Sequence, residues 1–106
     1  MADPELLFEV QTPLGFMVRV TRARWQLIVT NKHPVMAGHE VLVQGALESP
    51  DEIRQSRRDA HVFLFYKAAG ARRWVCAVAK GSRNPGFLIT AYPADAVKEG
   101  IRVWPR

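Results

Sequence analysis

His61-Val62-Phe63-Leu64-Phe65-Tyr66-Lys67, followed by Arg72-Arg73-Trp74-Val75-Cys76-Ala77-Val78-Ala79-Lys80, is the stretch of sequence that decides the fold. Both runs are rich in β-branched and aromatic residues, which favour strands. The residues between them, Ala68-Ala69-Gly70-Ala71, form a connection short enough for a hairpin. The sequence therefore predicts two paired antiparallel strands here, and the rest of the fold is expected to be built around them.

A third strand is predicted at residues 87–92, after the turn formers of residues 81–86. Pro93 is expected to end this strand, because proline cannot donate to a strand ladder. Residues 94–100 are expected to form a short connection with at most one helical turn, and residues 101–104 a final edge strand. The second half of the chain thus reads as an antiparallel meander of about four strands.

The first half of the chain predicts a hairpin and then a helix. Residues 6–10 and 16–20 are short extended runs on either side of a turn that contains proline and glycine. From Thr21 to about Asn31, apolar residues recur at helical spacing. Pro34 disfavours helical geometry at the preceding residue, so the helix is expected to stop at His33 and expose its side chain.

Two further helices are predicted before the meander. Apolar spacing favours a helix over residues 35–47, although Val41-Leu42-Val43 also suits an extended strand. Ser49, Pro50 and Glu52 match the N-cap, first position and third position of a helix with a capping box. The expected fold class is therefore α+β, in which an N-terminal hairpin and two to three helices pack on a roughly four-stranded antiparallel meander.

Composition indicates one globular domain over residues 1–106, with a basic surface. The formal net charge is +5, and such a surface attracts polyanions, although many small proteins carry an ordinary solvated basic surface. No apolar run approaches the roughly 20 residues that span a bilayer, and residues 1–5 are acidic where a secretory leader is basic. A cytoplasmic protein without a membrane partner is the expectation. The single cysteine, Cys76, lies in an apolar run and is expected to be a buried thiol.

Three residues are the first candidates for chemistry. An imidazole has an unperturbed pKa near neutrality, so a histidine such as His33 suits the role of general acid or base, whereas a histidine that ends a helix can also simply complement the helix dipole. Thr90 and Tyr92 alternate along the third strand and project from one face, where they can hold a phosphate and stack a base. Both residue types also favour strands for purely structural reasons.

Cations at strand ends and after the predicted short helix that starts at Pro50 are the second set of candidates. Lys80 ends one strand, and Arg54 provides a guanidinium that binds a phosphate in a bidentate manner. Further contacts to a nucleic-acid backbone are expected from four other cations, although each of them also suits a solvated surface: Lys67, Arg57, Arg58 and Arg83. The three histidines lack the spacing and the companion ligands of a zinc site, so neither a metal nor another cofactor is expected.

Taken in order, these residues resemble a family of phage-associated nuclease domains, grouped with barnase, EndoU, colicin-type tRNases and RelE toxins as the BECR fold. The resemblance spans about residues 16–104. It is carried by Trp25, His33-Pro34, the segment 47–53, Ser56, Asp59, Phe65-Tyr66, the segment 74–80, the segment 89–93, Gly100 and Trp104.

The resemblance implies a metal-independent RNA endonuclease of the toxin or mobile-element type, which cleaves by attack of the ribose 2′-hydroxyl and leaves a 2′,3′-cyclic phosphate. By this likeness His33 is the general acid or base, Thr90 and Tyr92 line the site, and Lys80 and Arg54 hold the phosphate. RNA, including tRNA, is the expected substrate, and an acidic inhibitor or antitoxin is an expected protein partner. The alternative is a non-catalytic module of the same fold that binds RNA or an acidic protein.

Overall fold

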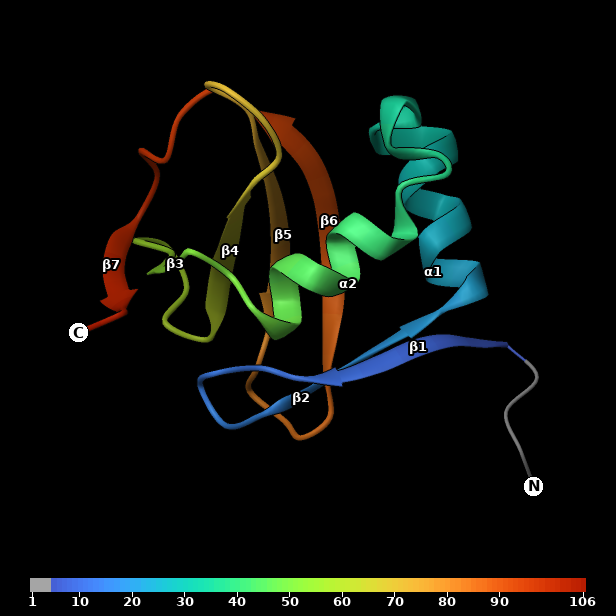
Figure 1. Cartoon of the computed structure of the whole chain (residues 1–106). Coiled ribbons are helices and arrows are strands. Elements are labelled where there is room, and N and C mark those ends of the chain that lie inside the picture. Colours follow the sequence, from blue (N-terminus) through green and yellow to red (C-terminus); the bar gives the residue numbers. More distant parts are fainter. Residues whose placement is uncertain (1–4) are drawn as a thin grey trace.

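A single seven-stranded mixed sheet, crossed on one face by helices, forms the body of the protein (Figure 1). The computed structural model describes residues 5–106, so most of the acidic N-terminal segment lies outside the described residues. Strand order across the sheet is β1-β2-β6-β5-β4-β3-β7. The elements are β1 (Leu6–Gln11), β2 (Met17–Thr21), α1 (Arg22–Leu27), α2 (Glu40–Glu48), β3 (Glu52–Gln55), β4 (Val62–Ala68), β5 (Trp74–Lys80), β6 (Gly86–Ala94) and β7 (Ile101–Trp104).

The expected four-stranded antiparallel meander is wrong in both strand number and pairing. The N-terminal hairpin of β1 and β2 does form, but it joins the sheet instead of standing apart from it. Val18 and Arg19 of β2 pair in parallel with Gly86 and Phe87 of β6, and this short contact makes the sheet mixed. Two residue pairs between segments so distant in sequence leave no periodic signal, so local patterns could not predict the contact.

The predicted strands of the meander are confirmed, except that Pro93 does not end the third of them. β4, β5 and β6 pair antiparallel in chain order, and Pro93 lies within β6 opposite Val75. Because β2 pairs with β6 only at Gly86 and Phe87, the rest of that edge has no strand partner. A proline is tolerated where one side of a strand needs no ladder donor.

A strand replaces the helix that was predicted to start at Pro50. Residues 52–55 form β3, which pairs antiparallel with β4 on one side and with β7 on the other. The hydroxyl of Ser49 donates to the carbonyl oxygen of Gly45 at 3.3 Å, at the end of α2, and does not cap a new helix. Ile53 is completely buried in this strand. Pairing on both sides therefore outweighs the local capping signal.

The two preceding helices differ from their predictions mainly in their limits. The hydroxyl of Thr21 accepts from the backbone N–H of Arg24 and caps α1, which continues as a π-helical turn over Ile28–Lys32. His33 then leaves the helical region, as Pro34 predicts. The second helix begins only at Glu40 because Gly38, with φ of +84°, breaks the chain after a 3-10 turn. No helical turn forms over residues 95–100.

The sheet has two chemically distinct faces. On one face, α2 packs through Val43, Ala46 and Leu47 into the main hydrophobic core (Figure 1). The opposite face, called the open face below, has a smaller buried cluster of Leu64, Tyr66 and Cys76, against which Trp74, Val78, Tyr92, Ala94 and Val97 pack. Within residues 5–106, no helical residue belongs to this cluster. None of the helices in residues 5–106 is long and apolar enough to cross a membrane.

Substitution of Ile53 tests the assignment of β3 as a central, paired strand. Ile53→Ala is expected to lower the free energy of unfolding by about 2–5 kcal/mol, because a fully buried side chain leaves a cavity. The matched control is Val41→Ala on α2, whose side chain is 80% exposed and whose loss is expected to cost less than about 0.5 kcal/mol. Urea unfolding of both variants measures the difference, and equal effects would contradict the placement of Ile53.

Candidate functional site

The register of the sheet places four of the predicted catalytic residues on the open face. Tyr92 lies opposite Cys76, and Thr90 lies opposite Val78. Residues directly opposite in an antiparallel pair share a face, as do alternate residues of one strand. Leu64 of β4 pairs with Val78 on one side and with Arg54 of β3 on the other, so Arg54 is on this face too. Lys80 is two residues beyond Val78 on β5, where it pairs with Val62, and it is therefore on the same face.

His33 lies at the edge of this face, against Tyr92. The two ring centroids are 5.4 Å apart, with the ring planes at 45°. Next to it, the ammonium group of Lys32 donates to the carbonyl oxygen of Ile89 at 3.1 Å, which ties the end of the π-helical turn to β6. His33 is half-buried. The structure thus brings together His33, Tyr92 and Thr90, which the sequence separates by more than fifty residues.

Tyr92 belongs to a row of three ionisable side chains, in which Cys76 lies between Tyr66 and Tyr92. The Cys76 thiol lies within hydrogen-bonding distance of the hydroxyls of Tyr66 and Tyr92. Burial is the main cause that raises the pKa of the thiol to about 12, and burial likewise raises the pKa of both phenols above their ordinary range. All three groups therefore remain protonated at neutral pH. Tyr92 can orient the His33 ring, but it is not a base.

The hydroxyl of Thr90 is the one site group with an unmet hydrogen bond. Its oxygen is buried and has no partner among the groups of the described chain. A buried hydroxyl without a partner costs free energy, so such groups are informative when they sit next to other polar residues. The hydroxyl of Thr90 lies on β6 between Tyr92, which contacts His33, and Phe87, which is opposite Lys80.

Lys80 has a carboxylate partner to which the sequence analysis gave no role. Its ammonium group lies 3.1 Å from a carboxylate oxygen of Asp59, in a contact that is about one-third exposed on both sides. The backbone N–H of His61 also donates to Asp59, at 2.9 Å. These two bonds, that of His61 first, hold the pKa of Asp59 below its ordinary value. The contact arises because the β4–β5 register places Val62, just after this turn, opposite Lys80.

Arg54 is on the same face but far from His33. Its Nε lies 2.6 Å from Oε2 of Glu52, and its Nη1 donates to the carbonyl oxygen of Gly100 at 3.2 Å. Arg54 and Thr90 occupy one row of the sheet but lie three strands apart, which corresponds to about 14 Å. Arg54 therefore fastens the segment before β7 to β3, and no group on β6 is within its reach.

Two hollows on this side of the protein are lined by several cationic side chains. One of about 460 Å³ is lined by Arg57, Arg58 and Lys98 together with Leu64 of the open face, and Glu99 is its carboxylate. The hydroxyl of Ser56 accepts from the backbone N–H of Arg58 and shapes this turn. The other hollow, of about 320 Å³, is lined by Lys80, Ser82, Arg83, Pro85 and Phe87.

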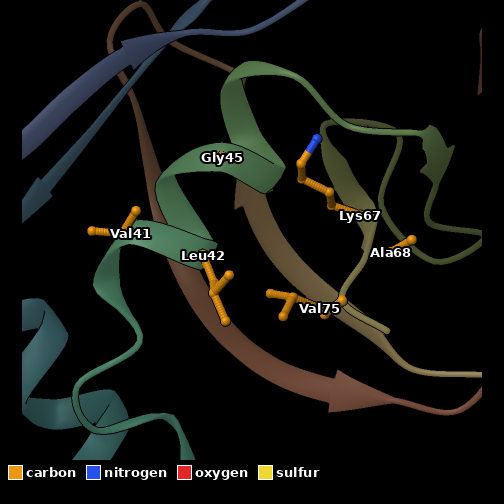
Figure 2. Close-up of a pocket in the computed structure, with 7 residues that line it drawn as sticks. Val41, Leu42, Gly45, Lys67, Ala68 and Val75 are labelled. Atoms are coloured by element: carbon orange, nitrogen blue, oxygen red, sulfur yellow. The ribbon is translucent and has the colours of Figure 1, made fainter. Parts of the chain in front are cut away.

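Lys67 lies apart from the other predicted RNA contacts, on the α2 face. It lines an apolar hollow of about 260 Å³ between α2 and the β4–β5 hairpin (Figure 2). Its ammonium group donates to the carbonyl oxygen of Ser49 at 2.7 Å. The other walls of this hollow, including Val41, Leu42 and Val75, carry no titratable group. Lys67 thus ties β4 to the end of α2, on the side of the sheet away from His33.

The open face therefore has two ends rather than one compact centre. His33 and Tyr92 occupy one end, Lys80 with Asp59 and Arg83 occupies the other, and Thr90 lies between them. Cys76, opposite Tyr92, and Lys80 are four residues apart on β5, which corresponds to about 13 Å. Within residues 5–106, no three His, Cys, Asp or Glu side chains lie close enough together to hold a metal ion.

The chain matches no protein-family model, no curated protein and no solved structure. The likeness to BECR-fold nucleases therefore rests on the residues and their order alone.

The buried thiol predicts a loss of stability at alkaline pH. Cys76 keeps its proton in the folded state, whereas in the unfolded chain it titrates at its ordinary value of about 8.5. The folded state then binds more protons, so the free energy of unfolding falls as pH rises through the unfolded value. We expect a loss of about 1 kcal/mol between pH 8 and 9.5, measured by urea unfolding. Cys76→Ala is expected to be nearly flat over this range, and an equal slope in both proteins would contradict the assignment.

Proposed function

We propose that the domain is a metal-independent RNA endonuclease that uses the open face of the sheet. The observation that carries the proposal is the placement of Thr90, Tyr92 and Lys80 on one face, with the His33 ring against Tyr92 at its edge. An imidazole can serve as a general acid or base, and a cation can stabilise the charge of a phosphate during transfer of a phosphodiester. The net charge of +5 favours a polyanionic substrate.

In the proposed reaction the ribose 2′-hydroxyl attacks the neighbouring phosphorus. The new O2′–P bond forms as the P–O5′ bond breaks, which leaves a 2′,3′-cyclic phosphate and a 5′-hydroxyl. His33 takes the proton from the 2′-hydroxyl or gives one to the leaving O5′, and solvent water carries out the other of these two proton transfers. Tyr92 holds the imidazole ring in place, and Lys80 attracts the RNA backbone. We expect this activity in the cytoplasm, with tRNA among the substrates and an acidic protein as the inhibitor.

A second candidate function is a non-catalytic RNA-binding module of the same fold. It is favoured by the ion pairs of the two cations assigned to the phosphate: Lys80 contacts Asp59, and Arg54 contacts Glu52. Arg57, Arg58 and Arg83, which line the two hollows, have no ion pair among the residues that the structure describes. A surface of this kind binds an RNA backbone without any need for His33.

Cleavage of RNA in the presence of EDTA tests the proposal. Total tRNA and a single-stranded RNA are incubated with wild type, His33→Ala and His39→Ala, and the products are analysed for cyclic phosphate ends. We expect His33→Ala to lose about 10²- to 10⁴-fold in rate, the usual contribution of a general acid or base. His39, an exposed residue at the start of α2, is the matched control and is expected to change the rate less than twofold.

Two outcomes would contradict the proposal, one in the role of His33 and the other in the activity itself. Full activity of His33→Ala would remove His33 from the chemistry. Salt-sensitive RNA binding by wild type without cleavage of either substrate would favour the binding module.

A further inference from the structure

Phe87 is the one exposed aromatic side chain in residues 5–106. Its side chain is 43% exposed, whereas the other phenylalanine, tyrosine and tryptophan side chains of this part of the chain are buried or half-buried. It belongs to neither of the two hydrophobic clusters of the protein. Its position in β6, opposite Lys80 on one side and Arg19 on the other, is one that a polar residue would fill without loss of core packing.

Cations surround the Phe87 ring. The guanidinium of Arg24, from α1, lies 5.7 Å from the ring centroid, in the range of a cation–π contact that steadies the ring. Lys80 and Arg83 line the hollow of about 320 Å³ beside the ring, together with Ser82 and Pro85. The lining includes no carboxylate of the described residues, and Arg83 has no ion pair among them, whereas Lys80 is paired with Asp59. An exposed aromatic ring among cations is the combination with which proteins hold single-stranded nucleic acids.

We propose that this hollow is a nucleotide subsite, in which one unpaired base of RNA stacks on Phe87 while the adjoining phosphate contacts Arg83 and Lys80. The subsite rests on the proposed function, because it assigns a substrate class to the same face. Single strands are specified because a base within a duplex is already stacked on its neighbours and has no free ring face to offer Phe87.

The subsite is expected to hold a nucleotide beside the cleaved bond and not the cleaved bond itself. A β-bulge between Leu88 and Thr90 sets Phe87 opposite Lys80, as Tyr92 is opposite Cys76, so both residues belong to the open face. They are separated by four residues of β5, which corresponds to about 13 Å. Lys80 connects the two ends, since it lines the hollow and also shares the open face with Thr90. The proposed path of the RNA therefore follows β6 from the Phe87 hollow towards His33.

Fluorescence of a short RNA with a single 2-aminopurine tests the subsite. The oligonucleotide is titrated in the His33→Ala background, which prevents cleavage, as a single strand and as a duplex with its complement. Phe87→Leu is expected to weaken single-strand affinity about 5- to 100-fold, the loss of one stacked base, and to abolish the stacking change in fluorescence. Phe87→Tyr keeps a ring and is expected to restore both, and duplex affinity is expected to change less than twofold.

The results separate the subsite from the nuclease. Single-strand affinity and fluorescence that are the same in Phe87→Leu as in its parent overturn the subsite, whether or not the wild type cleaves RNA. A tenfold loss of affinity in Phe87→Leu that Phe87→Tyr restores supports the subsite, even where wild type shows no cleavage and the nuclease proposal fails. Because the side chain of Phe87 is exposed, both variants are expected to melt within a few degrees of the wild type.

Discussion

The register of β5 against its two neighbours is the constraint on which the open face depends. β5 pairs along its whole length with β4 and β6, and Val75, Cys76, Ala77 and Ala79 are buried between the two faces. Because side chains alternate, a slip of one residue would carry Cys76 to the α2 core and Ala77 to the open face. The same slip would remove Lys80 from Thr90. Packing on both faces therefore fixes which polar residues meet.

The small cluster beneath the open face links this packing to chemistry. Tyr66 and Cys76 are fully or almost fully buried, and Tyr92 extends the same row to the edge of the sheet, where it meets His33. Burial keeps the thiol and both phenols neutral. The imidazole thus rests against an uncharged, well-packed support while remaining half-buried at the surface. A firm support for a titratable ring is what positioning a proton donor or acceptor requires.

Local patterns predicted the elements whose stability is local, and failed where distant pairing decides. The β-rich runs gave β4 and β5, the helical spacing near Trp25 gave α1, and Pro34 gave the break at His33. The capping signal of residues 49–52 pointed to a helix, but β3 gains ladder partners on both sides as a strand. The parallel contact of β2 with β6 carries no local signal at all.

The predictions of site residues likewise succeeded where local patterns decide and failed where distant contacts decide. Alternation along one strand correctly placed Thr90 and Tyr92 on a common face, and Pro34 correctly predicted the break at His33. The His33 side chain was expected to be exposed but is half-buried, because it packs against the ring of Tyr92. The partner of Lys80 could not be found, because Asp59 reaches it through a turn whose position depends on the β4–β5 register. Charge alone could not separate Lys67 from the other cations, since it reports neither the face of the sheet nor the bond to Ser49.

Mapping of RNA contacts on the protein surface tests most directly whether the open face is the functional one. Backbone amide shifts of the isotopically labelled domain are followed by NMR during titration with a short RNA whose 2′-hydroxyls are methylated, so that it cannot be cleaved. We predict shifts concentrated at Arg58, Lys80 and Thr90, with Val41 and Lys67 unchanged. Shifts concentrated on the α2 face, around Val41 and Lys67, would contradict the assignment of the site to the open face.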